Sequence, residues 1–171
     1  MKIRPTQLSD LEFVLSAERH PDNALYVNQW SRERHKSAIA SSEEGHFIAL
    51  LSDPQASDPQ ASLPVGYVIV SGLQDPHKTL LLRRIVAVKK GQGYGRKLLQ
   101  WVKSFAFDHL NYHRLWLDVV ASNQRAKALY LSEGFVIEGT LREAYKFQQG
   151  FEDMLILSLL RSEFDATNCQ R

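Results

Sequence analysis

Three glycines stand at alternate positions in the stretch VKKGQGYGRKLLQWV, which covers residues 88–102. Lysines and arginines surround them, and the apolar residues that follow have helical spacing. A turn alone needs one or two glycines to reach positive φ. Three glycines beside cations at the start of a helix are suited to hold an anion, because the N–H groups of a helix N-terminus attract negative charge. The turn therefore indicates phosphate binding.

Two other phosphate motifs and a plain turn compete with this interpretation. A P-loop requires a GK[ST] ending, which the sequence G-Y-G-R-K lacks. A dinucleotide-binding fingerprint requires the spacing G-x-G-x-x-G and a later acidic residue. The chain has G-x-G-x-G instead, although Asp118 lies at about the right distance. A flexible turn that binds nothing is the simplest alternative.

The turn resembles the pyrophosphate loop of the GNAT N-acetyltransferase superfamily, written Q/R-x-x-G-x-G/A. Lys90 stands at the leading Gln/Arg position, while Gly93 and Gly95 match. Lysine keeps the charge but lacks the guanidinium fork. The segment NQRAKALYLSEGF (123–135) resembles the superfamily's N-x-x-A-x-x-L-Y-x-x-x-G-F at every specified position. The runs FVIEGTLR and GFEDMLILSLL also resemble the subgroup of ribosomal-protein N-terminal acetyltransferases and polyamine acetyltransferases.

The resemblance implies transfer of an acetyl group from acetyl-CoA, a co-substrate, to a primary amine. The turn would hold the pyrophosphate, and backbone groups of the strand IVAV (85–88) would pair with the pantetheine arm. One N–H of that strand would also face the thioester oxygen. Asn123 would contact the same arm, although a plain helix N-cap is its common role. The expected cofactor-binding residues are Val86, Val88, Gly91, Gln92, Gly93, Tyr94, Gly95, Arg96 and Asn123.

The resemblance implies that Tyr130 is the general acid that protonates the leaving thiolate. An ordinary tyrosine pKa of about 10 keeps that proton in place at neutral pH. The general base is less clear, because the strand TLLLRRIVAV (79–88) carries no carboxylate and Leu81 stands where relatives often have one. Asp118 is our first candidate for the base. Glu143 and a chain of waters are alternatives, and a structural hydrogen bond is an equally good role for Asp118.

Other polar residues point to weaker hypotheses. Arg83 and Arg84 are adjacent on a predicted strand and must point to opposite faces, so one of them could face a substrate cleft. The six histidines show no H-x-x-x-H or H-x-H spacing, and we therefore expect no metal site. The three tryptophans are expected in the core or in a lid rather than in a cofactor platform.

The elements that must position these residues follow from periodicity. KIRPTQ near the N-terminus predicts a short edge strand, and FVIEGTLR begins a segment read as a short strand followed by irregular chain. A helix is predicted directly after the glycines. The remaining predicted helices are 9–20, 31–45 and 123–133, and the remaining predicted strands are 46–51, 65–73, 78–88, 114–120 and 154–160.

A strand, glycine turn, helix and strand in succession predict a crossover unit within a mixed sheet. The expected fold class is α/β (α+β). The resemblance specifies a single GNAT-like domain over residues 1–171, with a mostly antiparallel sheet flanked by helices and splayed at its centre. Within it we expect a cofactor-binding core at about 80–137, a flexible loop at 52–64 around the tandem repeat DPQASDPQAS, and a polar tail at 162–171.

Composition limits the partners. The chain has 171 residues and a formal net charge of +2, too small to argue for nucleic acid, and its basic residues cluster where a CoA phosphate is expected. No apolar run suggests a signal peptide or a membrane span, and the single cysteine, Cys169, excludes an internal disulfide. We expect a cytoplasmic monomer or homodimer that binds neither nucleic acid nor membrane.

The acceptor amine is left open by the sequence. The architecture suggests that the N-terminal helices, including residues 20–35, and the segment 140–150 bound its site. A protein N-terminus, a polyamine, an amino sugar and an antibiotic amine are all compatible. A non-catalytic acyl-CoA sensor on the same fold is the alternative to an enzyme. A polyamine would need carboxylates, which could come from Glu18, Asp22, Glu33, Glu43 and Glu44.

Overall fold

The computed structural model describes residues 1–52, 62–147 and 150–168. The chain forms two compact units, each built from two stretches of sequence. Unit 1 comprises Met1–Leu73 and Arg84–Leu99, and unit 2 comprises Gln74–Arg83 and Gln100–Arg171. Seven strands form the sheet in the order β1-β2-β3-β4-β5-β7-β6, so that β4 contributes to both units.

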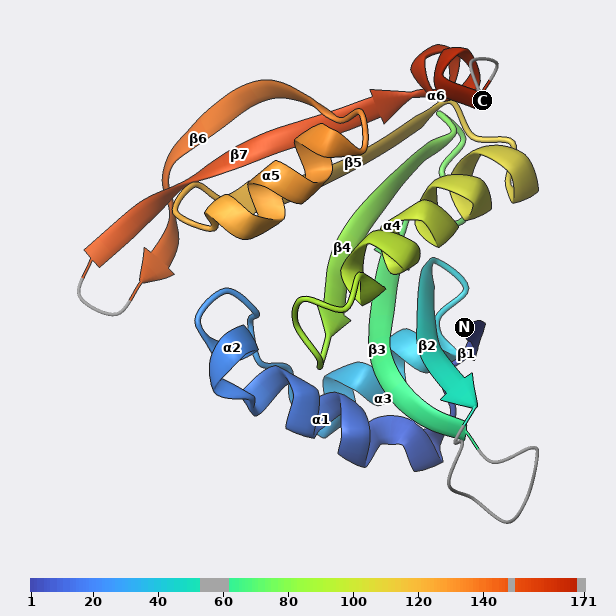
Figure 1. The fold of residues 1–171 in the computed structure, drawn as a ribbon, viewed down its shortest axis with the longest axis vertical. Coiled ribbons are helices and arrows are strands. Elements are labelled where there is room, and N and C mark those ends of the chain that lie inside the picture. The colour runs from blue at the N-terminus through green and yellow to red at the C-terminus, as the bar shows by residue number, and fades with distance from the viewer. Residues whose placement is uncertain (53–61, 148–149, 169–171) are drawn as a thin grey trace. The chain divides into compact units, whose positions relative to one another are not determined.

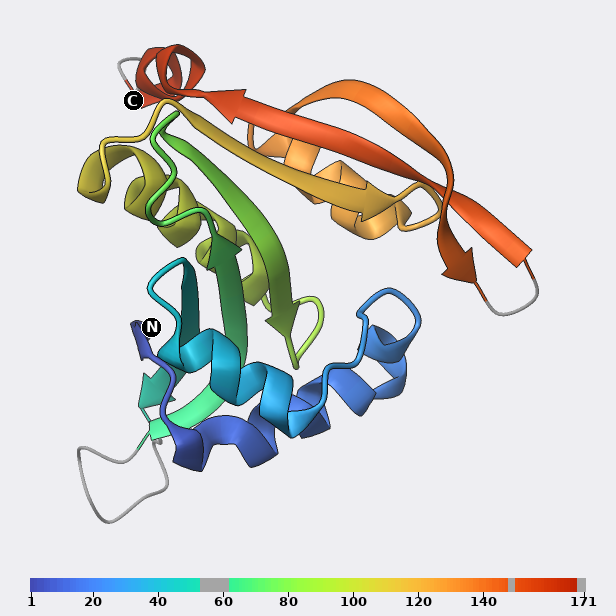
Figure 2. The ribbon, with the colours of Figure 1, turned by 180° about the vertical axis from the view of Figure 1, so that it is seen from behind.

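Unit 1 contains the N-terminal strands and helices (Figure 1). Strands β1 and β2 pair antiparallel, as do β2 and β3. Figure 2 shows α1 and α3 side by side across one face of these strands. The elements are β1 (Lys2–Pro5), η1 (Leu8–Asp10), α1 (Leu11–Arg19), α2 (Pro21–Ala24), α3 (Arg32–Ala40), β2 (Glu44–Ser52), β3 (Ser62–Ser71), the second half of β4 (Thr79–Ala87) and the first half of α4 (Tyr94–Ser104).

The core of unit 1 lies between α1 and strands β3 and β4. Its fully buried members are Val14, Ala17, Tyr67, Ile69 and Val86. Helix α1 contributes through its apolar stripe, as its sequence spacing predicts. On β3, the Cβ of any residue in place of Gly66 would lie 2.4 Å from the carbonyl oxygen of Val86 and 3.0 Å from Leu98 of α4. Glycine therefore allows the backbones of β3 and β4 to approach closely.

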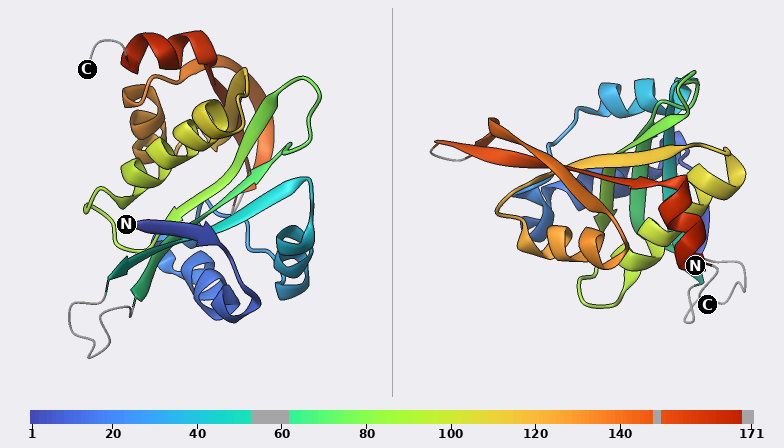
Figure 3. Two further views of the ribbon diagram at one scale, coloured as in Figure 1. Left: turned by 90° about the vertical axis from the view of Figure 1, so that its right-hand side faces the viewer. Right: turned by 90° about the horizontal axis from the view of Figure 1, so that it is seen from above.

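Unit 2 is built around a twisted hairpin of β6 and β7, seen from two directions in Figure 3. Strand β5 pairs antiparallel with β7, and β7 pairs antiparallel with β6. Strand β5 pairs parallel with β4. The elements are the first half of β4, the second half of α4, the π-turn η2 (Phe105–His109), β5 (Arg114–Val120), α5 (Gln124–Ser132), β6 (Val136–Phe147), β7 (Gly150–Leu160) and α6 (Arg161–Asn168).

The expected fold class is confirmed: the sheet is mixed and mostly antiparallel, with helices against it. The pairing of β4 with β5 covers only Thr79–Leu81 and Arg114–Trp116, which agrees with a sheet that is splayed at its centre. In the described chain, the edge of β4 that faces away from β3 therefore has no strand partner from Leu82 onward. Strand β1 lies at one edge of the sheet, as predicted.

Several element boundaries differ from the sequence expectation. Helix α3 stops at Ala40 rather than near Gly45, because the Ser41 hydroxyl accepts a hydrogen bond from the Glu43 N–H (3.1 Å) and competes with helical bonding. The chain after Phe135 forms one long strand, β6, rather than a short strand and an irregular segment. Its irregularity consists of two register shifts, one between Ile137 and Gly139 and one between Leu141 and Tyr145. The second contains Glu143, whose φ is 53°.

The C-terminal residues also differ from the expected polar tail. Helix α6 forms there and buries Phe164, whose ring stacks on that of Phe107 with centroids 4.8 Å apart. A single aromatic residue in a polar segment gives little periodic signal, so the sequence did not indicate this docking. The centre of the expected flexible loop, residues 53–61, lies outside the described residues.

Candidate active site

The glycine turn leads into α4 at Tyr94. Gly91 and Gly93 have φ values of 78° and 75°, and a Cβ at either position would meet no atom within 4 Å. Glycine is therefore needed for backbone conformation, while the space beside the turn is open. The carbonyl of Gly93 accepts the N–H of Lys97 (3.1 Å), a bond that closes the first turn of α4 directly after the glycines.

The charge around this turn suits an anion. The first turn of α4 contains no acidic residue and carries the exposed side chains of Arg96 and Lys97. Positive φ, open space, outward N–H groups and local cations together form a surface that a phosphate group can approach closely. These residues fit the pyrophosphate of a CoA molecule.

The last residues of β4 require a correction to the expected backbone donors. The N–H of Val88 donates to the carbonyl of Val65 on β3 at 3.0 Å, so it cannot face a thioester. The carbonyl of Val86 also lies toward β3, beside Gly66. Backbone groups of successive residues point to opposite edges of a strand. Ile85 and Ala87 therefore direct their N–H and C=O groups toward the edge away from β3.

Asn123 and Tyr130 stand on α5 in unit 2. The side-chain oxygen of Asn123 accepts the N–H of Ala126 at 3.2 Å, so Asn123 is the N-cap of the helix. Tyr130 is 6% exposed, and its ring packs against Phe135. Among the residues of unit 2 that the structure describes, none forms a hydrogen bond with its hydroxyl. Burial, and to a lesser degree the negative charge of Asp118, raise the pKa of Tyr130, so the phenol keeps its proton at neutral pH.

Asp118 lies on β5, and although the residue is exposed, the protein around its carboxyl group partly shields that group from water. The surrounding protein raises the pKa of its carboxyl group, and the guanidinium of Arg83 opposes this rise. Unit 2 thus brings Tyr130, Asp118 and Arg83 within electrostatic reach of one another. The other predicted base, Glu143, is exposed on β6 at the register shift, where its N–H is bound by Asp153 (2.9 Å). Of the two carboxylates, the electrostatic contact with Tyr130 favours Asp118.

Comparison with known proteins bears directly on these features. The model of the Acetyltransferase (GNAT) family matches residues 8–135, a range that includes both the glycine turn and the whole segment 123–135. The chain belongs to this family. It is an N-acetyltransferase, and acetyl-CoA is its co-substrate.

Individual relatives of this acetyltransferase carry more specific names. A spermidine N(1)-acetyltransferase of Vibrio cholerae is 25% identical over 96% of this chain and 95% of its own length. The protein of the same name from Escherichia coli K12 is 19% identical over 96% of this chain and 88% of its own length. A crystal structure of the Vibrio cholerae spermidine N-acetyltransferase with CoA and spermine superposes with a TM-score of 0.81 at 23% identity, over 95% of this chain and 96% of that one.

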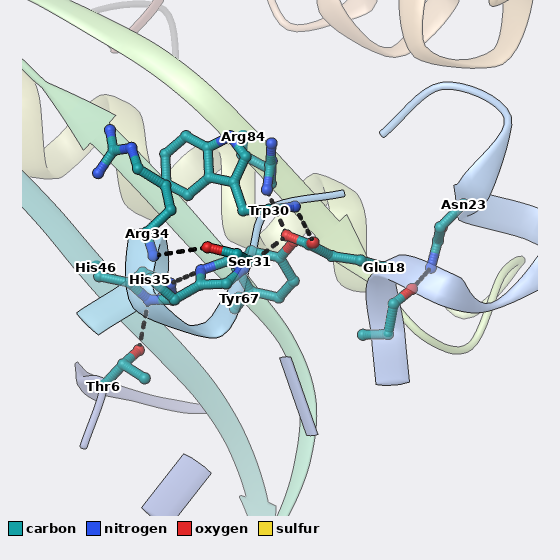
Figure 4. A network of polar contacts seen from close by, with 11 residues as sticks. Thr6, Glu18, Asn23, Trp30, Ser31, Arg34, His35, His46, Tyr67 and Arg84 are labelled. Carbon is teal, nitrogen blue, oxygen red and sulfur yellow. Dashed lines mark hydrogen bonds and ion pairs between the residues drawn. The ribbon is translucent and has the colours of Figure 1, made fainter. Parts of the chain in front are cut away.

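A buried polar network, drawn in Figure 4, is the feature of the acetyltransferase that sequence reasoning missed. Glu18 is 1% exposed and lies on the core side of α1. One of its oxygens accepts the Tyr67 hydroxyl (2.7 Å) and the guanidinium of Arg84, and the other accepts the N–H of Trp30 (3.0 Å). One carboxylate therefore connects α1, β3, β4 and the loop before α3.

Two histidines extend this network. His35 Nε2 faces Glu18 Oε1 at 3.1 Å, off the line of a good hydrogen bond. Its Nδ1 lies 3.1 Å from Nε2 of His46, whose Nδ1 lies 2.9 Å from the hydroxyl of Thr6. One set of neutral tautomers satisfies every contact: the hydroxyl donates to His46, His46 donates to His35, and His35 points its N–H at the carboxylate.

A sequence signal for the network did exist. Glu18 follows Leu11, Val14 and Leu15 at helical spacing and so continues the apolar stripe of α1, which places a carboxylate toward the core. Its partners are scattered through the chain, so the sequence did not identify them. The spacing of the six histidines, which we used only to argue against a metal site, does not indicate that the fold brings His35 and His46 together. Among the described residues, no group of three or more candidate ligands could hold a metal.

The structure also shows which carboxylates a polycation could use. Glu18 is committed to the network, and Glu44 forms two hydrogen bonds with Arg34 (2.7 and 2.8 Å). Asp22, Glu33 and Glu43 are exposed. Arg84, one of the two arginines considered for a cleft, is buried with Glu18, whereas Arg83 is exposed on the opposite face of β4. None of the described helices is long and apolar enough to span a membrane.

Proposed function

We propose that the protein transfers an acetyl group from acetyl-CoA directly to the primary amine of a small molecule, with Tyr130 as general acid. The observation that carries this proposal is the family match over residues 8–135, because it includes both the phosphate turn and the tyrosine segment. The buried, protonated phenol of Tyr130 supports its assigned role. We also place the enzyme in the cytoplasm, as its sequence predicts.

The proposed cofactor contacts come from both halves of the family motif. The turn Gly91–Gly95, with Gln92, Tyr94 and Arg96, would hold the pyrophosphate through backbone N–H groups and positive charge. The backbone groups of Ile85 and Ala87, at the edge of β4 away from β3, would pair with the pantetheine amides. They replace those of Val86 and Val88, which point toward β3. Ala87 then supplies the N–H for the thioester oxygen. Asn123 would contact the same arm with the part of its amide that the cap leaves unused.

The proposed chemistry needs three proton transfers. Acetyl-CoA supplies the acetyl thioester. Asp118 removes a proton from the incoming ammonium, so that a neutral amine attacks the carbonyl carbon and a C–N bond replaces the C–S bond. Tyr130 donates its proton to the departing thiolate, and the positively charged nitrogen of the intermediate then loses its second proton, which restores the phenol of Tyr130. A raised pKa makes Asp118 a better base than an ordinary aspartate, because proton affinity rises with pKa.

The proposed acceptor is a small amine, and polyamines are the first to be tested because the relatives are named for spermidine. Asp22, Glu33 and Glu43 are the exposed carboxylates of unit 1 from the expected set, and they would attract a polycation. Glu18 and Glu44 are excluded from this role by their partners. Of the carboxylates expected from the sequence, only Asp22, Glu33 and Glu43 are therefore available to bind a polyamine.

Calorimetric titration with acetyl-CoA tests the cofactor assignment. The wild type should bind, and Gly93→Asp should abolish binding, because Asp strains a residue with φ of 75° and repels phosphate. Gly139→Asp is the matched control: Gly139 has open space but no positive φ, and it should leave affinity unchanged. Equal binding by wild type and Gly93→Asp would refute the phosphate turn.

An amine panel with thiol detection tests the reaction. Spermidine, spermine, monoamines, an amino sugar and a peptide N-terminus are incubated with acetyl-CoA and the enzyme. Thiol release with at least one small amine, lost in Gly93→Asp, is the expected result. Tight binding of acetyl-CoA with no thiol release for any amine would instead support a non-catalytic acyl-CoA sensor.

A further inference from the structure

Asn23 is a buried amide in α2, a helix that contains no part of the two family motifs. Its side chain is in contact with two parts of unit 1: its NH₂ donates to the carbonyl of Ala17 (2.8 Å), and its oxygen accepts the ammonium of Lys90. Its backbone carbonyl accepts the N–H groups of Tyr26 (3.0 Å) and Val27 (2.9 Å). Asn23 is 3% exposed, so these contacts are shielded from water.

Lys90 immediately precedes the glycine turn. A free lysine side chain occupies many rotamers, and it must lose this conformational entropy when its ammonium is fixed on a ligand. Asn23 holds this ammonium before any ligand arrives, and Lys90 is the residue that directly precedes Gly91. Preorganisation of this kind improves affinity because the side chain loses less conformational entropy when the ligand binds. An ammonium has three N–H donors, so a contact with Asn23 is compatible with a second contact to a phosphate oxygen.

Packing connects the same two regions independently. Val27 and Trp30, from the segment after α2, pack against the core cluster that contains Val86. Val88, which leads into the glycine turn, packs against this cluster as well. The segment 20–31 is therefore connected to the residues that precede the glycine turn in two ways. The Asn23 amide contacts the Lys90 ammonium, and apolar side chains of the segment share a core cluster with Val88.

We propose that Asn23 is a positioning residue for acetyl-CoA, which acts by holding the ammonium of Lys90 at the pyrophosphate turn. This inference rests on the proposed function, because it requires that the turn binds the cofactor. The proposal also has a consequence for the acceptor amine, because residues 20–35 are expected to bound its site. A ligand that contacts the segment 20–31 and acetyl-CoA at the glycine turn should each alter the affinity for the other. Linkage requires any such influence on affinity to be reciprocal.

A double-mutant cycle in acetyl-CoA affinity tests this role. Wild type, Asn23→Ala, Lys90→Met and the double variant are titrated by calorimetry. Asn23→Ala should weaken binding roughly fivefold or more, within the usual range of coupling between sites. The double variant should bind no more weakly than Lys90→Met alone, because Asn23 acts only through Lys90. Independent effects that multiply in the double variant would overturn the proposal.

Two controls separate this role from a general loss of structure. Asn28→Ala makes the same chemical change at an exposed position of the same segment and should not alter acetyl-CoA affinity. Lys89→Met removes the neighbouring exposed lysine, and its effect should multiply with that of Asn23→Ala. If Asn23→Ala does not fold, as judged by circular dichroism, Asn23→Ser takes its place, since it leaves less of a void.

The salt dependence of binding gives a second readout. Attraction between Lys90 and a phosphate is screened by salt, so Lys90→Met should flatten the dependence of acetyl-CoA affinity on ionic strength. Asn23→Ala should flatten it in the same direction, which a purely structural defect would not do. An unchanged salt dependence in Asn23→Ala would contradict the proposal. Failure of the wild type to bind acetyl-CoA would instead refute the proposed function.

Discussion

Burial and charge act in the same direction on Tyr130. Its ring lies in the core of unit 2, and the negative charge of Asp118 further disfavours the phenolate. The phenol of Tyr130 therefore keeps its proton at neutral pH, so that a proton is available when the C–S bond breaks and the thiolate departs.

Tyr130→Phe tests this at the residue scale. The ring and its packing on Phe135 are kept, so acetyl-CoA affinity should be unchanged. The value of kcat should fall roughly 100-fold or more, the usual contribution of a general acid. Steady-state kinetics and calorimetry provide the two readouts. Tyr112→Phe removes a hydroxyl from another buried tyrosine of unit 2 and should spare kcat. Parallel loss of affinity and kcat in Tyr130→Phe would indicate a structural role instead.

The base assignment predicts a change in the pH profile. A carboxylate base works only when deprotonated, so the rate rises as pH rises through the pKa of Asp118, which burial places above its ordinary value. Asp118→Asn should flatten this rising limb of kcat/KM. Asp108→Asn, an exposed aspartate of the same unit, should leave the profile unchanged. A rising limb that survives in Asp118→Asn would point to Glu143 or to water.

At the scale of elements, the buried network makes the stability of unit 1 depend on pH. Burial lowers the pKa of His46 to about 4, and electrostatic interaction with His35 and with the guanidinium of Arg84 adds to this effect. The hydrogen bonds to Glu18 outweigh its burial and lower the pKa of its carboxyl group. The groups that face His46 are His35 of α3, Glu18 of α1, Tyr67 of β3, Arg84 of β4, Glu44 of β2 and Thr6.

The sign of the effect follows from linkage. Between pH 6.5 and 4 the unfolded chain protonates His46 while the folded chain does not, so unfolding becomes more favourable as pH falls through this window. Below it, protonation of Glu18 removes further stability. Thermal unfolding of His46→Gln should therefore depend less on pH from 7 to 4 than that of the wild type. His77→Gln, at an exposed histidine, should keep the wild-type slope; equal slopes for all three proteins would exclude His46 as the cause.

Strand β4 shows why element-level prediction is incomplete. The sequence of its apolar end, IVAV, has no alternation of polar and apolar residues, but burial alternates in the structure: Arg84 and Val86 are buried, while Ile85 and Ala87 are only half-buried. The direction of each backbone group was also not predictable, because it depends on which neighbour β4 pairs with. Because the N–H of Val88 donates to β3, the backbone N–H and C=O groups of Ile85 and Ala87 point to the other edge of β4.

At the scale of the whole molecule, the predicted site residues divide between the two units. The glycine turn, Lys90 and the end of β4 belong to unit 1, whereas Asp118, Asn123 and Tyr130 belong to unit 2. Strand β4 and helix α4 run through both units and connect them covalently. The proposed proton-transfer residues thus all lie in unit 2, whereas the proposed cofactor contacts lie in unit 1 except for Asn123.

The sequence by itself determined the family, the co-substrate and the two local motifs. The glycine turn and the segment 123–135 are contiguous, and each depends on short-range physics: positive φ, an N-cap and helical spacing. Only the tertiary structure decided the role of Glu18, the pairing of His35 with His46, and the contact between Asn23 and Lys90. These residues are far apart in the chain, and periodicity carries no information on which distant side chain will satisfy a buried charge.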